Sequence, residues 1–153
     1  MNTSYRLARL MDAEELTIMS MELYAEINSR KDFTDNKIVA TLRFYEQHSN
    51  MGEVLMIECD GDLAGYSIIF RFWSHEYGGL MLGVDELYIK KKFRRSGIAK
   101  QFIDLLIATE QSHPQFVGIE LEAHSNNTLA NKLFASVGMP QNNNAHYIKL
   151  LKQ

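Results

Sequence analysis

The chain has 153 residues, 46% of them hydrophobic and 23% charged, and a formal net charge of −3 at pH 7. These values are typical of one globular domain with a buried core, which we expect to span residues 1–153, and they argue against a general nucleic-acid binder, which is usually basic. No apolar run approaches the ~20 residues of a membrane span, and the lone Cys59 and a start without an apolar signal core lead us to expect a cytoplasmic protein with no membrane partner.

The first third of the chain predicts one strand followed by two helices. Residues 3–10 alternate loosely between apolar and polar and suit a strand. Asp12-Ala-Glu-Glu15 has the pattern of a capping box, and apolar residues follow it at helical spacing, so we predict a helix over residues 13–28. A second helix is predicted to begin at Asp35, after a polar loop over residues 29–34.

The middle of the chain predicts three consecutive strands. Val54–Glu58 and Leu63–Trp73 flank Asp60-Gly61, a dipeptide that strongly favours a two-residue β-hairpin. A turn at Tyr77-Gly78-Gly79 then leads into a long strand over Leu80–Lys90.

The last third predicts helices that alternate with strands. One face of a helix over residues 97–111 consists of Ile98, Phe102, Leu105 and Leu106. A strand over Phe116–His124 follows, and a last helix carries an apolar stripe over Ala130–Val137 and ends at Gly138. Tyr147–Leu151 is predicted to be a closing strand. The resulting order, β-α-α-β-β-β-α-β-α-β, describes an α/β chain with no linker or internal repeat.

The segment Asp85–Lys100 holds the densest group of candidate functional residues. A predicted strand with two carboxylates, Asp85 and Glu86, runs into a basic stretch and then into a glycine turn that opens a helix. The basic residues are Lys90, Lys91, Lys92, Arg94 and Arg95. Glycine lets the backbone approach a phosphate closely, and a helix N-terminus favours anions. The segment therefore predicts a phosphate clamp directly after a strand with a candidate base, rather than a solvated run of charges.

Two motifs resemble those of the GNAT superfamily of acetyl-CoA-dependent N-acetyltransferases. Arg94-x-x-Gly97-x-Ala99 is similar to the Arg/Gln-x-x-Gly-x-Gly/Ala signature, and the segment from Asn127 to Met139 is similar to the family's Asn-x-x-Ala-x-x-Leu/Phe-Tyr-x-x-x-Gly-Phe segment. The predicted element order is also that of the GNAT fold, so the resemblance covers essentially the whole chain. It implies a mostly antiparallel sheet that splays between its fourth and fifth strands, with the pantetheine arm of acetyl-CoA in the gap.

The resemblance also implies which residues contact acetyl-CoA. The strand end that would offer backbone groups to pantetheine and the thioester consists of Leu87, Tyr88 and Ile89. The pyrophosphate would lie against Arg94, Arg95, Ser96, Gly97, Ile98, Ala99 and Lys100. Asn127 would bond the pantetheine region, and Phe134 would pack near the thioester sulfur. The structural alternatives are a turn glycine at 97, a helix cap at 127 and a core aromatic at 134.

The chain departs from the family pattern at three positions. Arg95 stands where the family often has glycine, and Ala99 where it often has a third glycine. Phe134 stands where many members have a tyrosine whose hydroxyl is proposed to protonate the leaving thiolate. A free thiol has a pKa of about 8.5, so a thiolate that leaves unaided is one alternative, and weak or absent catalysis is another. The other candidates for protonating the thiolate are Tyr147, Tyr88, His124 and a water, among which the sequence does not choose.

The predicted reaction needs a base, because an alkylamine with a pKa of ~10.4 is almost wholly protonated at pH 7. Asp85 and Glu86 resemble an acidic pair at the same place in spermidine/spermine N-acetyltransferases. Regular alternation would send the two side chains to opposite faces, but family members often have a bulge here, which would change their direction. We predict Glu86 as the base, directly or through water, with Asp85 second. The alternative for at least one of them is a cap or an ion pair with a nearby lysine.

The resemblance implies an enzyme that transfers acetyl from acetyl-CoA to a primary amine of a small cationic molecule, by direct attack in a ternary complex. A protein or peptide amine is the nearest alternative acceptor, whereas a closed pocket rimmed by residues 29–34 and 72–79 would favour a small molecule. Phe134 supports a further alternative, a GNAT module that senses acetyl-CoA without turnover. The five histidines lack metal-ligand spacing, so we expect no metal. Family members commonly dimerise, so we expect a homodimer.

Overall fold

Five strands form one sheet in the described part of the chain, which comprises residues 2–27, 35–124 and 127–151 of this computed structural model. The strands are β1 (Thr3–Leu7), β2 (Gly52–Cys59), β3 (Asp62–Ser74), β4 (Gly79–Ile89) and β5 (Phe116–Leu121). They lie side by side in this order. β1 to β4 pair antiparallel, whereas β5 pairs parallel to β4. The sheet is therefore mostly antiparallel, as predicted.

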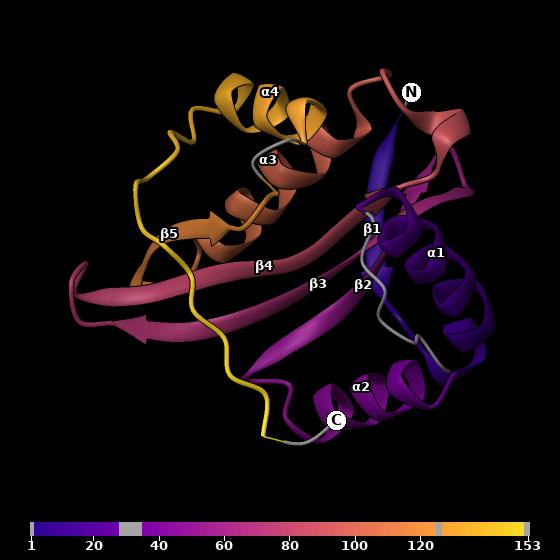
Figure 1. The fold of residues 1–153 in the computed structure, drawn as a ribbon, viewed down its shortest axis with the longest axis horizontal. Coiled ribbons are helices and arrows are strands. Elements are labelled where there is room, and N and C mark those ends of the chain that lie inside the picture. The colour runs from indigo at the N-terminus through magenta and orange to yellow at the C-terminus, as the bar shows by residue number, and fades with distance from the viewer. Residues whose placement is uncertain (1, 28–34, 125–126, 152–153) are drawn as a thin grey trace.

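Helices cover both faces of the sheet (Figure 1). They are α1 (Ala13–Glu26), α2 (Asp35–Gln47), α3 (Ile98–Glu110) and α4 (Thr128–Ser136), with two short 3-10 turns, η1 (Leu10–Asp12) and η2 (Lys91–Phe93). α1 and α2 pack on one face, and α3 and α4 pack on the other. The predicted order of elements is confirmed from β1 to α4. The predicted end of the first helix at residue 28 and the predicted loop over residues 29–34 lie outside the described residues.

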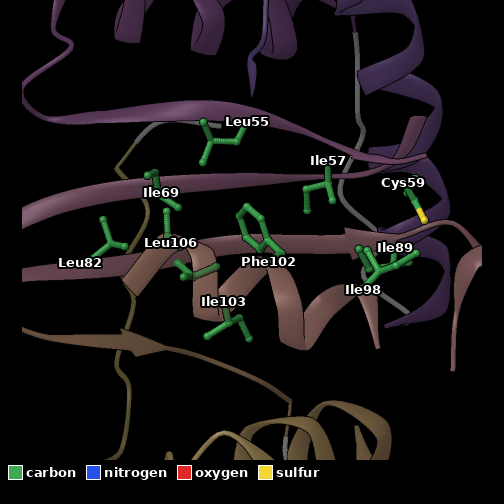
Figure 2. Packing of buried hydrophobic residues seen from close by; sticks show 12 residues of the cluster. Leu55, Ile57, Cys59, Ile69, Leu82, Ile89, Ile98, Phe102, Ile103 and Leu106 are labelled. Carbon is green, nitrogen blue, oxygen red and sulfur yellow. The ribbon is translucent and has the colours of Figure 1, made fainter. Parts of the chain in front are cut away.

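The core on the α3 side is a helix stripe packed on the inward side chains of three strands (Figure 2). The stripe consists of Ile98, Phe102, Ile103 and Leu106, none more than 1% exposed. The strands contribute Leu55, Ile57, Cys59, Ile69, Leu82, Val84 and Ile89. Leu105 was predicted to belong to the stripe but is 39% exposed. At about 100° per residue it lies at the edge of the buried arc, and Ile103 fills the other edge.

The core on the opposite face places two buried tyrosines beneath the first two helices. Leu16 and Met19 of α1 and Ile38 and Leu42 of α2 pack against the sheet there. The sheet residues of this cluster are Val54, Met56, Tyr66, Ile68 and Tyr88. Tyr66 is 0% exposed and Tyr88 is 2% exposed, so their hydroxyl groups need hydrogen-bond partners inside the protein.

Local turn chemistry sets both hairpins of the meander. Asp60 and Gly61 have φ angles of 52° and 88°, the positive values of a type I′ turn, so the predicted hairpin is confirmed. Gly78 has a φ of 66° in the turn before β4, which begins at Gly79. Glycine adopts such angles at no steric cost, which explains why the sequence places glycine at positions 61 and 78.

The fourth and fifth strands separate part-way along their length. They pair from Leu80 opposite Phe116 to Val84 opposite Leu121. Beyond Val84, β4 continues to Ile89, and no strand of the described chain pairs with this stretch on the β5 side. The predicted splay is therefore present, and its open stretch of β4 begins at the two candidate acids.

The predicted closing strand over Tyr147–Leu151 is wrong. Residues 139–151 contain no strand, and Tyr147 is 90% and Leu151 86% exposed. Figure 1 shows this segment leaving α4 as an extended trace. An alternating pattern stabilises a strand only when a neighbouring edge pairs with it, and no such pairing exists for this segment among the described residues. The preceding strand also ends earlier than predicted, at Leu121 rather than His124.

The capping box predicted for the first helix is also wrong. The Asp12 carboxylate accepts both Nη1 and Nη2 of Arg6 at 2.9 Å and the backbone N–H of Arg9 at 2.7 Å. It makes no side-chain cap of α1. The guanidinium of Arg6, hydrogen-bonded to Asp12, lowers the pKa of that carboxyl below its ordinary value. The Asp12 side chain therefore binds Arg6, six residues upstream, instead of capping α1.

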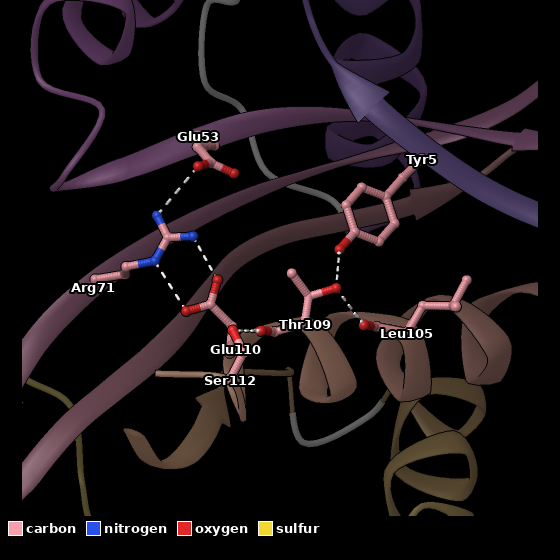
Figure 3. A network of polar contacts seen from close by, with 7 residues as sticks. All are labelled: Tyr5, Glu53, Arg71, Leu105, Thr109, Glu110 and Ser112. Carbon is pink, nitrogen blue, oxygen red and sulfur yellow. Dashed lines mark hydrogen bonds and ion pairs between the residues drawn. The ribbon is translucent and has the colours of Figure 1, made fainter. Parts of the chain in front are cut away.

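A charged network fastens the C-terminal end of α3 to the sheet (Figure 3). Nε of Arg71, on β3, donates to Oε2 of Glu110 at 3.1 Å, and Nη1 lies 3.5 Å from Oε1 of Glu53 on β2. The hydrogen bond to Glu110 raises the pKa of Arg71. Nearby, the hydroxyls of Tyr5 and Thr109 lie 2.8 Å apart. These contacts connect β1, β2 and β3 to the last turn of α3.

Candidate active site

A β-bulge in β4 brings both candidate acids to one side of the sheet. Ile68 on β3 lies opposite Glu86, but the next residue, Ile69, lies opposite Val84. Asp85 is therefore the extra residue of the bulge. Regular alternation would separate Asp85 and Glu86 onto opposite faces, whereas here both line the same cavity. The bulge thus decides the question of direction that the sequence left open.

The cavity lies between α2 and the strands β3 and β4 and has a volume of about 460 Å³. Its lining residues are Lys37, Ile38, Ala40, Thr41, Phe44, Tyr45, Ile68, Asp85 and Glu86. Burial, and next the charge of Asp85, raise the pKa of Tyr45, so this phenol stays neutral. Apolar and aromatic walls around two carboxylates and one lysine suit a molecule that carries positive charge and some apolar surface.

Two phenols hold the Glu86 carboxylate. Tyr24 of α1 donates to Oε1, and Tyr66 of β3 donates to Oε2 at 2.7 Å. The hydroxyl of Tyr66 in turn accepts Oγ of Ser20 at 3.0 Å. Burial is the largest cause of the raised pKa of both tyrosines, and the neighbouring Glu86 adds to it. Both phenols therefore remain protonated donors.

The basic turn after β4 contains two residues in the left-handed region. Arg95 has a φ of 62°, and Gly97, the residue before α3, has a φ of 82°. The first backbone hydrogen bond of α3 runs from the N–H of Gln101 to the carbonyl of Gly97 at 2.9 Å. The N–H groups of residues 98–100 come before this bond, at the helix N-terminus where N–H groups have no acceptor within the helix. A Cβ built on Gly97 would meet only Nε2 of Gln101, at 3.9 Å. Open space therefore adjoins the backbone of the turn.

Acidic residues of α1 contact the basic turn, and these contacts were not predicted from the sequence. Arg94 donates Nη2 to both carboxylate oxygens of Glu26, at 2.9 and 3.0 Å, and Nε to the carbonyl of Ile89 at 2.8 Å. Lys90 pairs with Glu15, and Nζ of Lys91 lies 3.8 Å from Glu26. Acids at positions 15, 22 and 26 share one face of a helix, and this spacing was the signal that could have revealed the contact.

The alternation of hydrogen bonds between β3 and β4 decides which backbone groups of β4 face the gap that opens between β4 and β5 beyond Val84. The N–H of Lys90 donates to the carbonyl of Ala64 at 2.8 Å. Because alternate residues of an antiparallel ladder point to the same neighbour, Tyr88 directs its backbone to β3, whereas Leu87 and Ile89 direct theirs to the open side. Of the three strand-end residues that the resemblance implied, two therefore have backbone groups on the side of the gap.

The remaining candidates have structural contacts of their own. Asn127 caps α4 by accepting the N–H of Ala130 on Oδ1 at 3.1 Å, and Phe134 packs against the α3-side core. Lys100 pairs with Asp104 at 2.7 Å. The hydroxyl of Ser96 donates to the carbonyl of Phe93, which tightens the turn. The remaining two members of the proposed cradle, Ile98 and Ala99, form the first turn of α3, where the Ile98 side chain is buried in the core.

The candidate proton donors are not gathered at the cavity. Tyr147 lies on the exposed C-terminal segment, whereas the described residues that line the cavity belong to α2, β3 and β4. Tyr88 donates its hydroxyl to Oε2 of Glu22 on α1 at 2.7 Å. His124 follows the end of β5. The structure thus brings Asp85 and Glu86 together but places Tyr147 elsewhere.

Two surveys of the described residues bear on other kinds of site. No group of three or more His, Cys, Asp or Glu side chains is placed to hold a metal ion in the described ranges. No helix in the same ranges is both long enough and apolar enough to cross a membrane.

Comparison with known proteins decides the family. A model of the acetyltransferase (GNAT) family matches residues 20–139. The chain belongs to this family. As a GNAT acetyltransferase it is an N-acetyltransferase, and acetyl-CoA is the usual co-substrate of the family. No curated protein matches the sequence significantly.

Solved structures of other proteins share the GNAT fold of this chain. A possible acetyltransferase from Clostridium difficile 630 matches with a TM-score of 0.81 and 17% identity, covering 100% of both chains. A ribosomal-protein-alanine N-acetyltransferase from Brucella melitensis biovar Abortus 2308 matches with a TM-score of 0.74 and 24% identity, over 99% of this chain and 100% of that one. An aminoglycoside acetyltransferase from an uncultured soil metagenomic sample, solved with sisomicin, has a TM-score of 0.72 and 14% identity, over 98% and 97%.

Proposed function

We propose that the protein transfers acetyl from acetyl-CoA to a primary amine of a small cationic molecule, by direct attack in a ternary complex. One observation carries the proposal. The bulge at Asp85 directs the carboxylates of Asp85 and Glu86 into one cavity, at the point where β4 separates from β5. An amine held against these carboxylates would therefore lie beside the gap between the strands, which is where the family binds the acetyl donor.

The residues of the gap and the basic turn fit acetyl-CoA. Gly97 leaves open space beside the turn, and the N–H groups of residues 98–100 suit a pyrophosphate. Arg95 adds a cation to the same turn. Leu87 and Ile89 direct backbone groups to the gap, as binding of the pantetheine amides requires. These features support a site for the nucleotide end and a site for the thioester end.

In this mechanism Glu86 takes the proton of the acceptor amine, directly or through a water. When bound, acetyl-CoA supplies a thioester whose carbonyl carbon the neutral amine attacks and whose thiolate leaves. The backbone N–H of Ile89 or Leu87 is the donor placed for the developing oxyanion. Asp85, beside Glu86, adds negative charge that attracts the cationic acceptor and is the second candidate base.

Phe134 makes departure of the thiolate the least assisted step. Its ring has no hydroxyl, and it packs against the core. Because a free thiol has a pKa of about 8.5, its thiolate can leave at neutral pH without an acid and then take a proton from water. Tyr147 stays a candidate donor that requires the C-terminal segment to move to the gap. A chain that binds acetyl-CoA and acetylates nothing would instead be a sensing module.

A small cationic acceptor is supported by the cavity itself. Its volume of about 460 Å³ lies in the range of small-molecule sites, and two of its lining residues are carboxylates, which favour a cationic acceptor. Of the two rims that the sequence analysis named, residues 29–34 lie outside the described residues, and none of residues 72–79 lines this cavity. Sisomicin, bound by one structural relative, and ribosomal-protein alanine, named for another, define the two acceptor classes to compare.

The test is an acceptor panel in which release of free CoA thiol is measured with a chromogenic thiol reagent. Small diamines, aminoglycosides and peptides with free N-termini are supplied with acetyl-CoA, with Glu86→Gln as the control. We expect CoA release with the small cations. Release with peptides alone would favour the peptide alternative. A thermal melt stabilised by acetyl-CoA without release from any amine would establish the sensing module. Sedimentation of the same sample tests the expected homodimer.

A further inference from the structure

The Glu86 carboxylate is approached by phenols from two different elements. Tyr24 reaches Oε1 from α1, and Tyr66 reaches Oε2 from within the sheet. The same carboxylate lines the cavity, so a molecule in the cavity approaches it from that side. Neither phenol lines that cavity. The two bonds therefore fix the direction of the carboxylate from behind.

The position of Tyr24 is itself fixed by the residues around it on α1. Glu22 accepts the hydroxyl of Tyr88 at 2.7 Å, and Glu26 accepts Nη2 of Arg94 at 2.9 Å. Four residues earlier on the helix, Ser20 donates to Tyr66 at 3.0 Å. Contacts on both sides of Tyr24 thus hold this part of α1 against β3, β4 and the basic turn, and a side chain held in this way keeps its geometry.

We propose that Tyr24 is a positioning residue for the base: its phenol holds the Glu86 carboxylate ionised and directed into the acceptor cavity. The proposal rests on the proposed function, in which Glu86 accepts the proton of the amine. Two hydrogen bonds from neutral donors favour the charged form of a carboxylate, so they keep Glu86 deprotonated and ready to accept a proton. They also prevent rotation of the carboxylate away from the substrate.

The groups around Glu86 come from four elements and must be considered together. Among the described residues, the titratable side chains that bond to Glu86 or line its cavity are Tyr24 on α1, Lys37 and Tyr45 on α2, Tyr66 on β3 and Asp85 on β4. Lys37 favours the ionised carboxylate and Asp85 disfavours it. Replacing Tyr24 by phenylalanine removes one donor and leaves these charges and the aromatic ring in place. The titration of Glu86 should therefore move to higher pH.

The first experiment needs no turnover. The Glu86 carboxyl is followed by carbon NMR of protein labelled at glutamate, and its resonance is assigned by its absence in Glu86→Gln. In Tyr24→Phe we expect the titration midpoint to rise by about one pH unit, the size expected for one lost hydrogen bond to a charged group. Tyr5→Phe is the matched control, since it removes a phenol that bonds to Thr109 on the other side of the sheet. Its midpoint for Glu86 should equal that of the wild type.

The second experiment measures the pH dependence of kcat with the best acceptor of the panel. We expect Tyr24→Phe to move the acid limb upward by the same amount and to lower kcat about tenfold, with an unchanged KM for acetyl-CoA and a melting temperature close to that of the wild type. An acid limb and an NMR midpoint that both stay at the wild-type values would overturn the proposal, even if kcat fell. If no amine is acetylated, the proposed function fails, and the NMR titration still decides the role of Tyr24.

Discussion

The contact between Glu26 and Arg94 predicts that α1 competes with acetyl-CoA for the basic turn. Arg94 is expected to bind the pyrophosphate, yet its Nη2 lies 2.9 and 3.0 Å from the two oxygens of Glu26. A bound pyrophosphate must share this guanidinium or displace Glu26. Replacing Glu26 by glutamine removes the competing charge, so CoA and acetyl-CoA should bind more tightly.

The size of this effect follows from the exposure of the pair. Both side chains are 30% exposed, and ion pairs near the surface typically contribute about 0–1 kcal/mol. Because ~1.4 kcal/mol corresponds to a factor of ten, the dissociation constant of CoA should fall by up to about fivefold. Loss of the ion pair should lower the melting temperature of the free protein only slightly.

Calorimetric titration with CoA at two salt concentrations measures the effect. Glu14→Gln is the matched control, because it removes the same charge from an exposed position in the first turn of α1. Higher salt should reduce the difference between Glu26→Gln and the wild type, since it screens the competing carboxylate. A dissociation constant that is unchanged or larger in Glu26→Gln would refute competition for Arg94, as would an equal gain in Glu14→Gln.

Four further predictions concern the base, the fold and the turn. Glu86→Gln should lower kcat by ~10²–10⁴-fold with unchanged affinity for CoA, and a loss below about tenfold would point to Asp85 as the base. Arg71→Met should lower the free energy of unfolding by about 2 kcal/mol in urea denaturation, because the partly buried carboxylates of Glu110 and Glu53 lose a charged partner; an effect within error would contradict this. Arg95→Gly should relieve the strained φ of 62° and stabilise the free protein by about 0.5–1 kcal/mol while weakening CoA binding, and a lower melting temperature would count against it. Because the pKa of Asp12 is lowered in the folded protein, its carboxylate stabilises the fold above the ordinary value of 3.8, and this contribution is lost as the pH falls through the folded-state pKa. Asp12→Asn should therefore show a smaller loss of stability in acid than the wild type. Parallel plots of unfolding free energy against pH for the two proteins would contradict this.

The parts of the fold that were predictable are those set by local residues. Asp60-Gly61 fixes a type I′ hairpin through the backbone preferences of two adjacent residues, and it forms as expected. Gly138 likewise ends α4: it has a φ of 76°, and the N–H of Met139 donates to the carbonyl of Phe134 at 2.9 Å. The splay of β4 from β5 came from the family resemblance, which is itself carried by two local motifs.

The features that could not be predicted depend on pairs of residues far apart in the chain. The resemblance raised a bulge near Asp85 as an alternative, but its presence is a property of the register between β3 and β4, which no single strand contains. The contact of Tyr24 with Glu86 spans 62 residues. The closing strand failed for the same reason, because alternation in Tyr147–Leu151 specifies the two faces of a strand but not the neighbour that must pair with it.

The position of α1 relates the two halves of the proposed site. Within the short stretch from Glu22 to Glu26, the helix contacts the proposed base, Glu86, through Tyr24 and the basic turn through Glu26. Tyr24 and Glu26 are two residues apart on this helix, and each contacts a different part of the proposed site. If the pyrophosphate displaces Glu26, the constraint on Tyr24 changes at the moment when the acetyl donor arrives. The residues that contact the proposed base and the proposed pyrophosphate site thus lie on the same turn of α1.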